Sequence, residues 1–235
     1  IKSAFFYPGV LFTVAIGVTI FMLMNVVPTF VKMYEGMGMG DDLPTPTAVI
    51  MSMSEFLRSS GGLILFILIV TSVVGFRYLI SKNYNIRKSW HAFTLKMPIF
   101  GNLLKKSILA KVSMVLGNLN QAGVDLIESI DIAKSVTTNT IVIEALENIK
   151  KGVFSGDTLT SLFNKEKVFP STFSQLISVG EQTGSLDDMF GSVASYYEEE
   201  FDVAVGNLSS LIEPIMMVFM GITIGGLMLA MYAPI

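Results

Sequence analysis

The sequence predicts an all-α integral membrane protein with three transmembrane helices and one cytoplasmic antiparallel helical bundle of about six helices. Its 235 residues are 51% hydrophobic and only 15% charged, whereas a soluble domain carries about 25% charge. The mean hydropathy is +0.62. Between the uncharged runs, apolar residues recur at helical spacing without sustained strand-like alternation. A membrane must therefore cover much of the apolar surface, and the segments outside the membrane are also predicted to be helical.

The first predicted span occupies residues 1–27. Phe5 to Val27 contains 23 residues without a charge, which corresponds to roughly 35 Å of helix and exceeds the hydrocarbon core. The run is longer than a signal-peptide core, and Val26-Val27-Pro28 is no small-residue cleavage site. We therefore interpret it as a span. Because the sequence starts almost directly at this span, we expect a further segment on its N-terminal side.

Two more uncharged runs complete the membrane part. The run between Arg58 and Arg77 predicts a second span over residues 63–80, and the run after Glu213 predicts a third over residues 211–235. Residues 28–62 then form an external loop, in which Thr45-Pro46 predicts the start of a short helix.

Cations in the connecting segments predict the orientation. Residues 28–62 hold only Lys32 and Arg58 against four acids, whereas eight cations and no acid lie between Arg77 and Val124. Positive residues concentrate on the cytoplasmic side of membrane proteins. The N-terminus and the segment after the second span are therefore predicted to be cytoplasmic, and the C-terminus external.

Residues 81–210 are too long for a loop and predict the helical bundle. Its breakers are expected at Pro98 with Gly101, Ala122-Gly123, Asp125, Thr137 to Asn139, Gly156-Asp157 and Pro170-Ser171. The apolar positions that face the core are predicted to include Ile108, Val112, Val115, Leu116, Leu119, Val142, Ala145, Leu146, Ile149 and Val153.

Charge is segregated within this region. Residues 77–124 carry eight cations and no acids, whereas residues 125–202 carry five lysines and 14 acids. The cations either only set the topology or bind anionic lipid. The acidic residues either form one solvent-exposed face or dock a basic or mixed-charge cytoplasmic partner. The predicted membrane-surface residues are Arg77, Lys82, Arg87, Lys88, Lys105 and Lys106.

The composition excludes several classes of chemistry. The chain has no cysteine and one histidine, His91, which argues against thiol nucleophiles, metal centres and catalytic triads. The net charge of −3 argues against nucleic-acid binding. Gly38-Met39-Gly40-Asp41 has the letters of an intramembrane aspartyl protease motif, but no predicted span holds a second aspartate. We expect no catalytic, cofactor or metal site.

The stretch from Gly180 to Ser185 lacks the lysine of a phosphate-binding loop. It predicts a corner between two antiparallel helices, in which Gly180 ends the first helix and Gly184 allows a tight turn. Ser185 with Asp188 forms a candidate capping box for the next helix. The corner does not obviously require Glu181.

A series of motifs resembles one family. It comprises Val26-Val27-Pro28, Leu43-Pro44, Met97-Pro98-Ile99-Phe100-Gly101, Ala122-Gly123-Val124, Phe169-Pro170, Val179 to Leu186, Tyr197-Glu198, Glu213-Pro214 and Tyr232 to Ile235. In this order the motifs resemble the type II secretion system F proteins and the type IV pilus assembly platform proteins. The most specific element is the Gly-Glu-x-x-Gly corner followed by Glu213-Pro214, and the resemblance covers essentially the whole chain.

The resemblance implies a non-enzymatic platform in the bacterial inner membrane that forms a homo-oligomer. The implied partners are a cytoplasmic hexameric assembly ATPase, pilin or pseudopilin transmembrane helices, and other inner-membrane assembly proteins. The family has two homologous cytoplasmic domains, and this sequence lacks the first, which puts in doubt any ATPase contact made through that domain. Pilus and secretion members share these motifs.

The predicted docking and structural residues are Gly180, Glu181, Gly184, Glu198, Glu199, Glu200, Glu213 and Pro214. Glu213 is either an interfacial anchor before a helix that starts at Pro214, or it pairs with another helix or with the positive N-terminus of an incoming pilin. Gly221 and Gly225 form a small face for close helix packing, against a second protomer or a neighbour within the chain. We hypothesise that the helix from Ser185 toward Glu213 transmits motion from the ATPase.

One alternative function stays open, a small transporter or channel subunit. It predicts polar residues along the spans, and few are present: Thr13, Thr19, Asn25, Thr71, Ser72 and Thr223.

Overall fold

A computed structural model describes residues 6–36 and 45–232, and these residues contain helices and no strands. The predicted all-α class is therefore confirmed. The Gly38-to-Asp41 motif, Leu43-Pro44 and the last three residues lie outside the described residues. The chain forms two compact units, the membrane unit (residues 1–77 and 207–235) and the bundle unit (residues 78–206).

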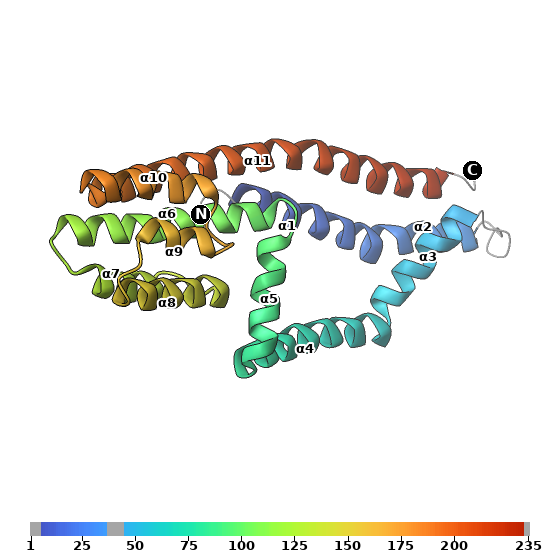
Figure 1. Ribbon diagram of the computed structural model, residues 1–235. Helices are drawn as coiled ribbons and strands as arrows, with labels where there is room; N and C mark the ends of the chain where they lie inside the picture. Colours follow the sequence, from blue (N-terminus) through green and yellow to red (C-terminus); the bar gives the residue numbers. More distant parts are fainter. Residues whose placement is uncertain (1–5, 37–44, 233–235) are drawn as a thin grey trace. The chain divides into compact units, whose positions relative to one another are not determined.

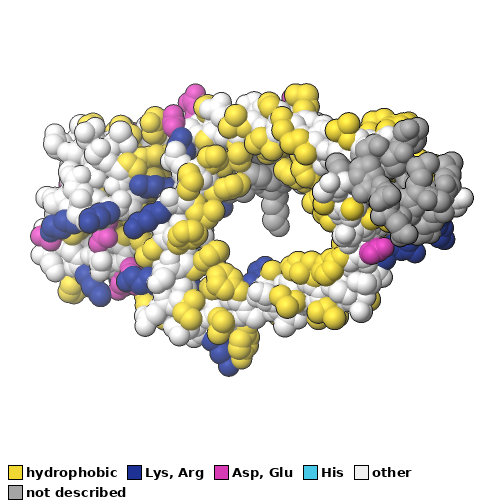
Figure 2. Space-filling view, turned by 90° about the vertical axis from the view of Figure 1, so that its right-hand side faces the viewer, with side chains coloured by type: hydrophobic (Ala, Val, Ile, Leu, Met, Phe, Trp, Pro, Cys, Tyr) yellow, Lys and Arg dark blue, Asp and Glu magenta, His cyan; other side chains and the backbone are white. Residues whose placement is uncertain are grey.

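The membrane unit contains the helices α1 (Phe6–Phe21), η1 (Met22–Val26), α2 (Val27–Gly36), α3 (Thr45–Arg58), most of α4 (Ser60–Lys82) and the second half of α11 (Leu186–Tyr232). Within the described residues, three helical segments are long and apolar enough to cross a membrane: Gly9–Met33, Ser60–Lys82 and Leu186–Leu229. No residue of α4 is buried, and Figure 2 shows hydrophobic side chains spread over much of the displayed face. Such exposure suits contact with lipid.

The first span contains a π-helix, η1, in which the N–H of Val27 donates to the carbonyl of Met22. The hydroxyl of Ser54, on α3, donates a buried 2.5 Å hydrogen bond to the carbonyl of Leu23. A π-turn widens the helix, and we attribute to it the passage of the helix through Pro28, whose ring would clash in a regular turn. The helix therefore continues past Val27, where the sequence placed the end of the first span, as far as Gly36.

The bundle unit consists of six complete helices, the end of α4 and the first half of α11. The six are α5 (Tyr84–Lys96), α6 (Phe100–Gln121), α7 (Leu126–Ser135), α8 (Thr140–Phe154), α9 (Leu159–Lys165) and α10 (Ser171–Thr183). In this unit α7 lies beside α8, and α9 lies beside α10 (Figure 1).

The predicted helix breakers lie at or next to helix ends, as expected. Asp125 and Asn139 cap α7 and α8, because their side chains accept hydrogen bonds from the N–H groups of Ile127 and Ile141. Gly123 follows α6 with a φ of 76°, in the left-handed region that favours glycine.

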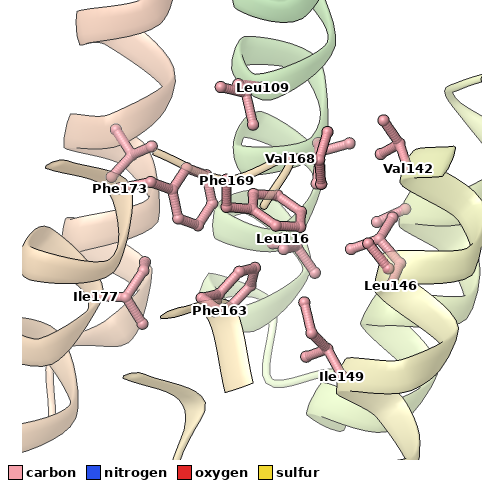
Figure 3. Packing of buried hydrophobic residues seen from close by; sticks show 14 of the residues in the cluster. Leu109, Leu116, Val142, Leu146, Ile149, Phe163, Val168, Phe169, Phe173 and Ile177 are labelled. Carbon is pink, nitrogen blue, oxygen red and sulfur yellow. The ribbon is translucent and has the colours of Figure 1, made fainter. Parts of the chain in front are cut away.

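Aromatic rings form the centre of the bundle core. Phe163, on α9, is fully buried, and its ring centroid lies 4.8 Å from those of both Phe169 and Phe173. Figure 3 shows Phe163 between these rings and the aliphatic side chains of α6 and α8, among them Leu116 and Ile149. The predicted core positions of α6 and α8 are buried or partly buried, which confirms the helical periodicity. The short α9 is thus held by its core contacts, because seven residues alone make a marginal helix.

Candidate functional site

The corner between α10 and α11 differs from the prediction at Gly180. Helix α10 continues through Gly180 and ends at Thr183. Gly184 caps it with a φ of 72° and donates its N–H to the carbonyl of Gly180. Gly180 therefore does not end the helix. A Cβ at this position would lie 2.8 Å from Cγ of Met189 and 3.2 Å from Cα of Leu186. The glycine is needed because α10 and α11 approach closely here. This role depends on how the two helices pack, which no local sequence pattern reveals.

Glu181 has a clear structural function at this corner. One carboxylate oxygen accepts a 2.7 Å hydrogen bond from the N–H of Leu159, and the other accepts from the N–H of Thr160 at 3.1 Å and its hydroxyl at 2.7 Å. These donors belong to the first turn of α9, whose N-cap residue Thr158 makes no side-chain capping bond. Glu181 thus supplies, from α10, the acceptor that an N-terminal helical turn needs.

The surroundings of Glu181 favour its charged form. Burial by itself would raise the pKa of the carboxyl group, but the hydrogen bonds from Thr160 and Leu159 outweigh it and hold the pKa below its ordinary value. The carboxylate is therefore engaged within the bundle. The predicted role of Glu181 in docking a partner remains a prediction.

The acidic stretch on α11 contains two exposed glutamates and one that is paired. Glu198 and Glu199 are exposed. Glu200 forms a 2.7 Å ion pair with Lys106 of α6, and the Lys106 ammonium also reaches the Glu200 carbonyl. Tyr197 turns inward instead, and its hydroxyl lies 3.0 Å from that of Thr172. Of the three glutamates, Glu198 and Glu199 thus form no ion pair with a described residue, and the predicted docking role of this stretch remains a prediction.

The predicted membrane-surface cations divide into several environments. Lys88 forms a 2.6 Å ion pair with Glu144 of α8, and Lys106 is paired with Glu200. Lys82 lies over the ring of Tyr78, and Arg87 over that of Tyr84, at 4.9 and 5.6 Å from the centroids. Two of the six thus link the basic half of the chain to its acidic half.

The two remaining cations differ in exposure. Lys105 is half-buried, and desolvation lowers the pKa of its ammonium group. Arg77, in the membrane unit, is exposed. The lipid contacts of all six cations remain a prediction.

A groove in the membrane unit contains Glu213. Helices α1 and α11 enclose a cavity of about 330 Å³ that is lined by apolar side chains and one carboxylate: Leu11, Val14, Ala15, Val18, Glu213, Met216, Met217 and Met220. Val14 and Met217 are largely exposed, so the groove opens to the surface of this unit. A carboxylate in an otherwise apolar groove between two segments that are apolar enough to cross a membrane marks a candidate functional site.

Pro214 lies inside α11 and does not start a helix, contrary to the prediction. Its ring nitrogen cannot donate the usual hydrogen bond to the carbonyl of Ser210. The helix nevertheless runs for 47 residues from Leu186 to Tyr232, so the predicted continuity from the corner toward Glu213 is confirmed. A missing bond in the middle of a long helix costs less than a complete break, because both flanking segments are already helical.

The two glycines of the third span have open surroundings. A Cβ at Gly221 or Gly225 would meet no atom within 4 Å among the described residues. The packing partner predicted for this face is therefore not a described neighbour within the chain.

Sequence reasoning missed three contacts that join distant segments. These are the groove between α1 and α11, the bonds from α9 to Glu181, and the pairing of His91 with Thr140. Nδ1 of His91 on α5 lies 2.9 Å from both the N–H and the hydroxyl of Thr140, at the start of α8. Asn139 signals the start of α8, but no local signal identifies His91 as the second acceptor there. Among the described residues, no group of three or more His, Asp or Glu is placed to hold a metal ion.

Comparison with known proteins places the chain in a family. The family model described as "Type II secretion system (T2SS), protein F" matches residues 113–234, which include the corner, the acidic stretch and Glu213. The chain belongs to this family. The resemblance inferred from the motifs is confirmed.

Curated members of the T2SS protein F family match along the whole chain. The type IV pilus assembly protein PilC of Pseudomonas aeruginosa is 36% identical over 237 residues, and the PilC of Myxococcus xanthus is 35% identical over 240. The type II secretion system protein F of Pseudomonas aeruginosa is 31% identical over 235 residues. The chain spans 62%, 55% and 57% of the length of these three relatives.

Proposed function

We propose that the chain acts as an inner-membrane platform of a type IV pilus or type II secretion machine. In this function it is a scaffold that couples a cytoplasmic assembly ATPase to the insertion of pilin or pseudopilin subunits into a fibre. Membership of the T2SS protein F family and three spanning segments support this role. The observation that carries the proposal is the apolar groove with the Glu213 carboxylate.

The groove suits an apolar helix that begins with a positive charge. Its lining is almost entirely aliphatic and methionine-rich, and flexible methionine side chains adapt to varied partner surfaces. An unpaired carboxylate within a membrane is costly, and a cationic partner offsets that cost. The positive N-terminus of a pilin transmembrane helix supplies both features. Glu213 would then hold the incoming subunit while the groove covers the first turns of its helix.

Helix α11 provides the coupling in this proposal. Its residues up to Gly206 belong to the bundle unit and those from Asn207 belong to the membrane unit. Continuous backbone hydrogen bonds make a helix stiff along its axis, so motion of one half is passed to the other. Pro214, directly after Glu213, removes one of these bonds and offers a point of bending beside the groove.

The ATPase is proposed to dock on the exposed acids of α11. Glu198 and Glu199 precede the membrane unit on this helix and carry unpaired charges among the described residues. Complementary charge speeds association and selects partners. A basic surface on the ATPase would therefore be recognised next to the helix that transmits its motion.

Site-specific photo-crosslinking in cells that contain the complete machine tests the groove. A photoreactive residue at Val14 or Met217 is expected to capture the pilin or pseudopilin, whereas one at Ile67 on α4, equally apolar but outside the groove, is not. Glu213→Gln should reduce both the crosslink and fibre assembly, and Glu213→Asp should partly restore them. Equal capture at all three positions, or unaffected assembly in Glu213→Gln, would contradict the proposed groove function.

Charge reversal tests the docking surface. The double variant Glu198→Lys and Glu199→Lys should abolish co-purification of the ATPase while the helical content of the chain stays unchanged. The matched control is Asp157→Lys, an exposed acid before α9, which should leave ATPase recruitment intact. Retention of the ATPase by the double variant would show that docking occurs elsewhere.

A further inference from the structure

A second cavity lies between α2 and α3 in the membrane unit. It has a volume of about 170 Å³ and combines an apolar floor with a charged rim. We call the half-buried apolar lining residues the floor (Pro28, Val31 and Met51) and the exposed charged ones the rim (Lys32, Glu55 and Arg58). The neighbouring Ser54 is already bonded to the Leu23 carbonyl and holds α3 in place along the first span.

The two cations on this rim, Lys32 and Arg58, come from a segment that contains few positive charges. Residues 28–62 contain only two Lys or Arg residues, and the fold brings both to the same cavity, although they are separated by 26 positions. Both side chains are exposed, as is Glu55, and no described residue forms an ion pair with any of the three. The cavity therefore carries two positive charges and one negative charge, and a bound anion would balance the excess positive charge.

The position of the cavity matches the headgroup level of a bilayer. Lys32 is the last residue but one of the apolar segment Gly9–Met33, where the hydrocarbon core meets the headgroups. Pro28 and Val31 of this segment belong to the apolar floor, which suits the first carbons of an acyl chain. A phospholipid presents its phosphate at this level.

We propose that this cavity binds a phospholipid with a phosphoethanolamine headgroup. Lys32 and Arg58 hold the phosphate through charge-assisted hydrogen bonds, and the Glu55 carboxylate accepts from the primary ammonium group. The start of an acyl chain lies over Pro28, Val31 and Met51. Glu55 provides selectivity, because the quaternary amine of phosphatidylcholine has no N–H to donate and the glycerol of phosphatidylglycerol carries no positive charge. The lipid thereby fastens α3 to the first span.

Lipid binding by the full chain in detergent tests the proposal through native mass spectrometry. The probes are phosphatidylethanolamine, phosphatidylcholine and phosphatidylglycerol with identical acyl chains. The unmodified chain should retain phosphatidylethanolamine roughly threefold to tenfold better than phosphatidylcholine, as expected for charged hydrogen bonds at a partly solvated site. Lys32→Gln with Arg58→Gln should lose this binding. Lys111→Gln, an exposed lysine of the bundle unit, should retain it.

The variant Glu55→Gln separates headgroup recognition from general attraction to lipid. It should lose the preference for phosphatidylethanolamine over phosphatidylcholine and bind phosphatidylglycerol more tightly, because one negative charge is removed. Unchanged selectivity in Glu55→Gln, or unchanged binding in the double variant, would overturn the proposal. Displacement of the lipid by an equal concentration of inorganic phosphate would also overturn it, because the cavity would then be a free phosphate site. The test needs only the membrane unit to be intact, so its outcome is independent of the platform function.

Discussion

Replacing Glu181 with alanine is expected to lower the free energy of local unfolding of helix α9. The carboxylate accepts three hydrogen bonds from the first turn of α9, and α9 has no side-chain cap of its own. Loss of an N-terminal cap costs about 0.5–2 kcal/mol, and leaving half-buried donors unpaired costs about 1–3 kcal/mol. We therefore expect the local opening free energy of α9 to fall by about 2 kcal/mol, which accelerates amide exchange about 30-fold.

Hydrogen exchange of the full chain in detergent, read by mass spectrometry, measures this effect in peptides that cover Leu159–Lys165. Glu181→Ala should accelerate exchange there, and Glu181→Gln should do so less, because the amide oxygen keeps one neutral acceptor. Glu199→Ala is the matched control, since Glu199 is exposed on α11. Its α9 peptides should exchange as in the unmodified chain.

Acidification provides an independent check on the charge of Glu181. Its pKa in the folded chain is held below the ordinary value of 4.5. The contribution of the carboxylate to stability is therefore complete above that value and is lost as the pH falls through the lower, folded pKa. After correction for intrinsic exchange, protection of α9 should decrease in acid in the unmodified chain but not in Glu181→Ala. Unchanged α9 protection in Glu181→Ala at neutral pH would refute the capping argument.

Three further predictions concern helix contacts. Gly180→Ala should lower the free energy of unfolding by about 1–3 kcal/mol through overpacking. Gly191→Ala, whose added Cβ meets nothing within 4 Å, should not lower it. Thermal unfolding followed by circular dichroism compares the two variants. Burial, with a smaller contribution from a nearby arginine, lowers the pKa of His91. The hydrogen bonds between His91 on α5 and Thr140 on α8 should therefore weaken as the pH falls below 6.5. Amide exchange of α8 should show this pH dependence, and His91→Gln should remove it. Ser54→Ala removes the buried hydrogen bond to the Leu23 carbonyl and should cost about 1 kcal/mol, measured as easier unfolding in a denaturing-detergent titration.

Signals within a few residues accounted for much of the fold. The uncharged runs predicted three membrane-crossing segments, Asp125 and Pro170 predicted helix starts, and Thr137 to Asn139 predicted a break between helices; the structure contains all of these. Such signals succeed because hydrophobic length and end capping act within one helix. Two predictions that were wrong, at Gly180 and Pro214, concerned residues whose local preference is overruled by the helices around them. Gly180 is required by the approach of Met189, and Pro214 is accommodated within a long helix.

By itself, the sequence determined the class of this protein. Its apolar runs require a membrane, its periodicity requires helices, and its ordered motifs identify the T2SS protein F family. Only the tertiary structure decided what the charged residues do. It joined Glu181 to α9, Lys106 to Glu200, and Lys32 and Arg58 to one cavity. The physical reason is that burial and helicity depend on neighbouring residues in the chain, whereas the partner of a charge depends on which distant helices pack together.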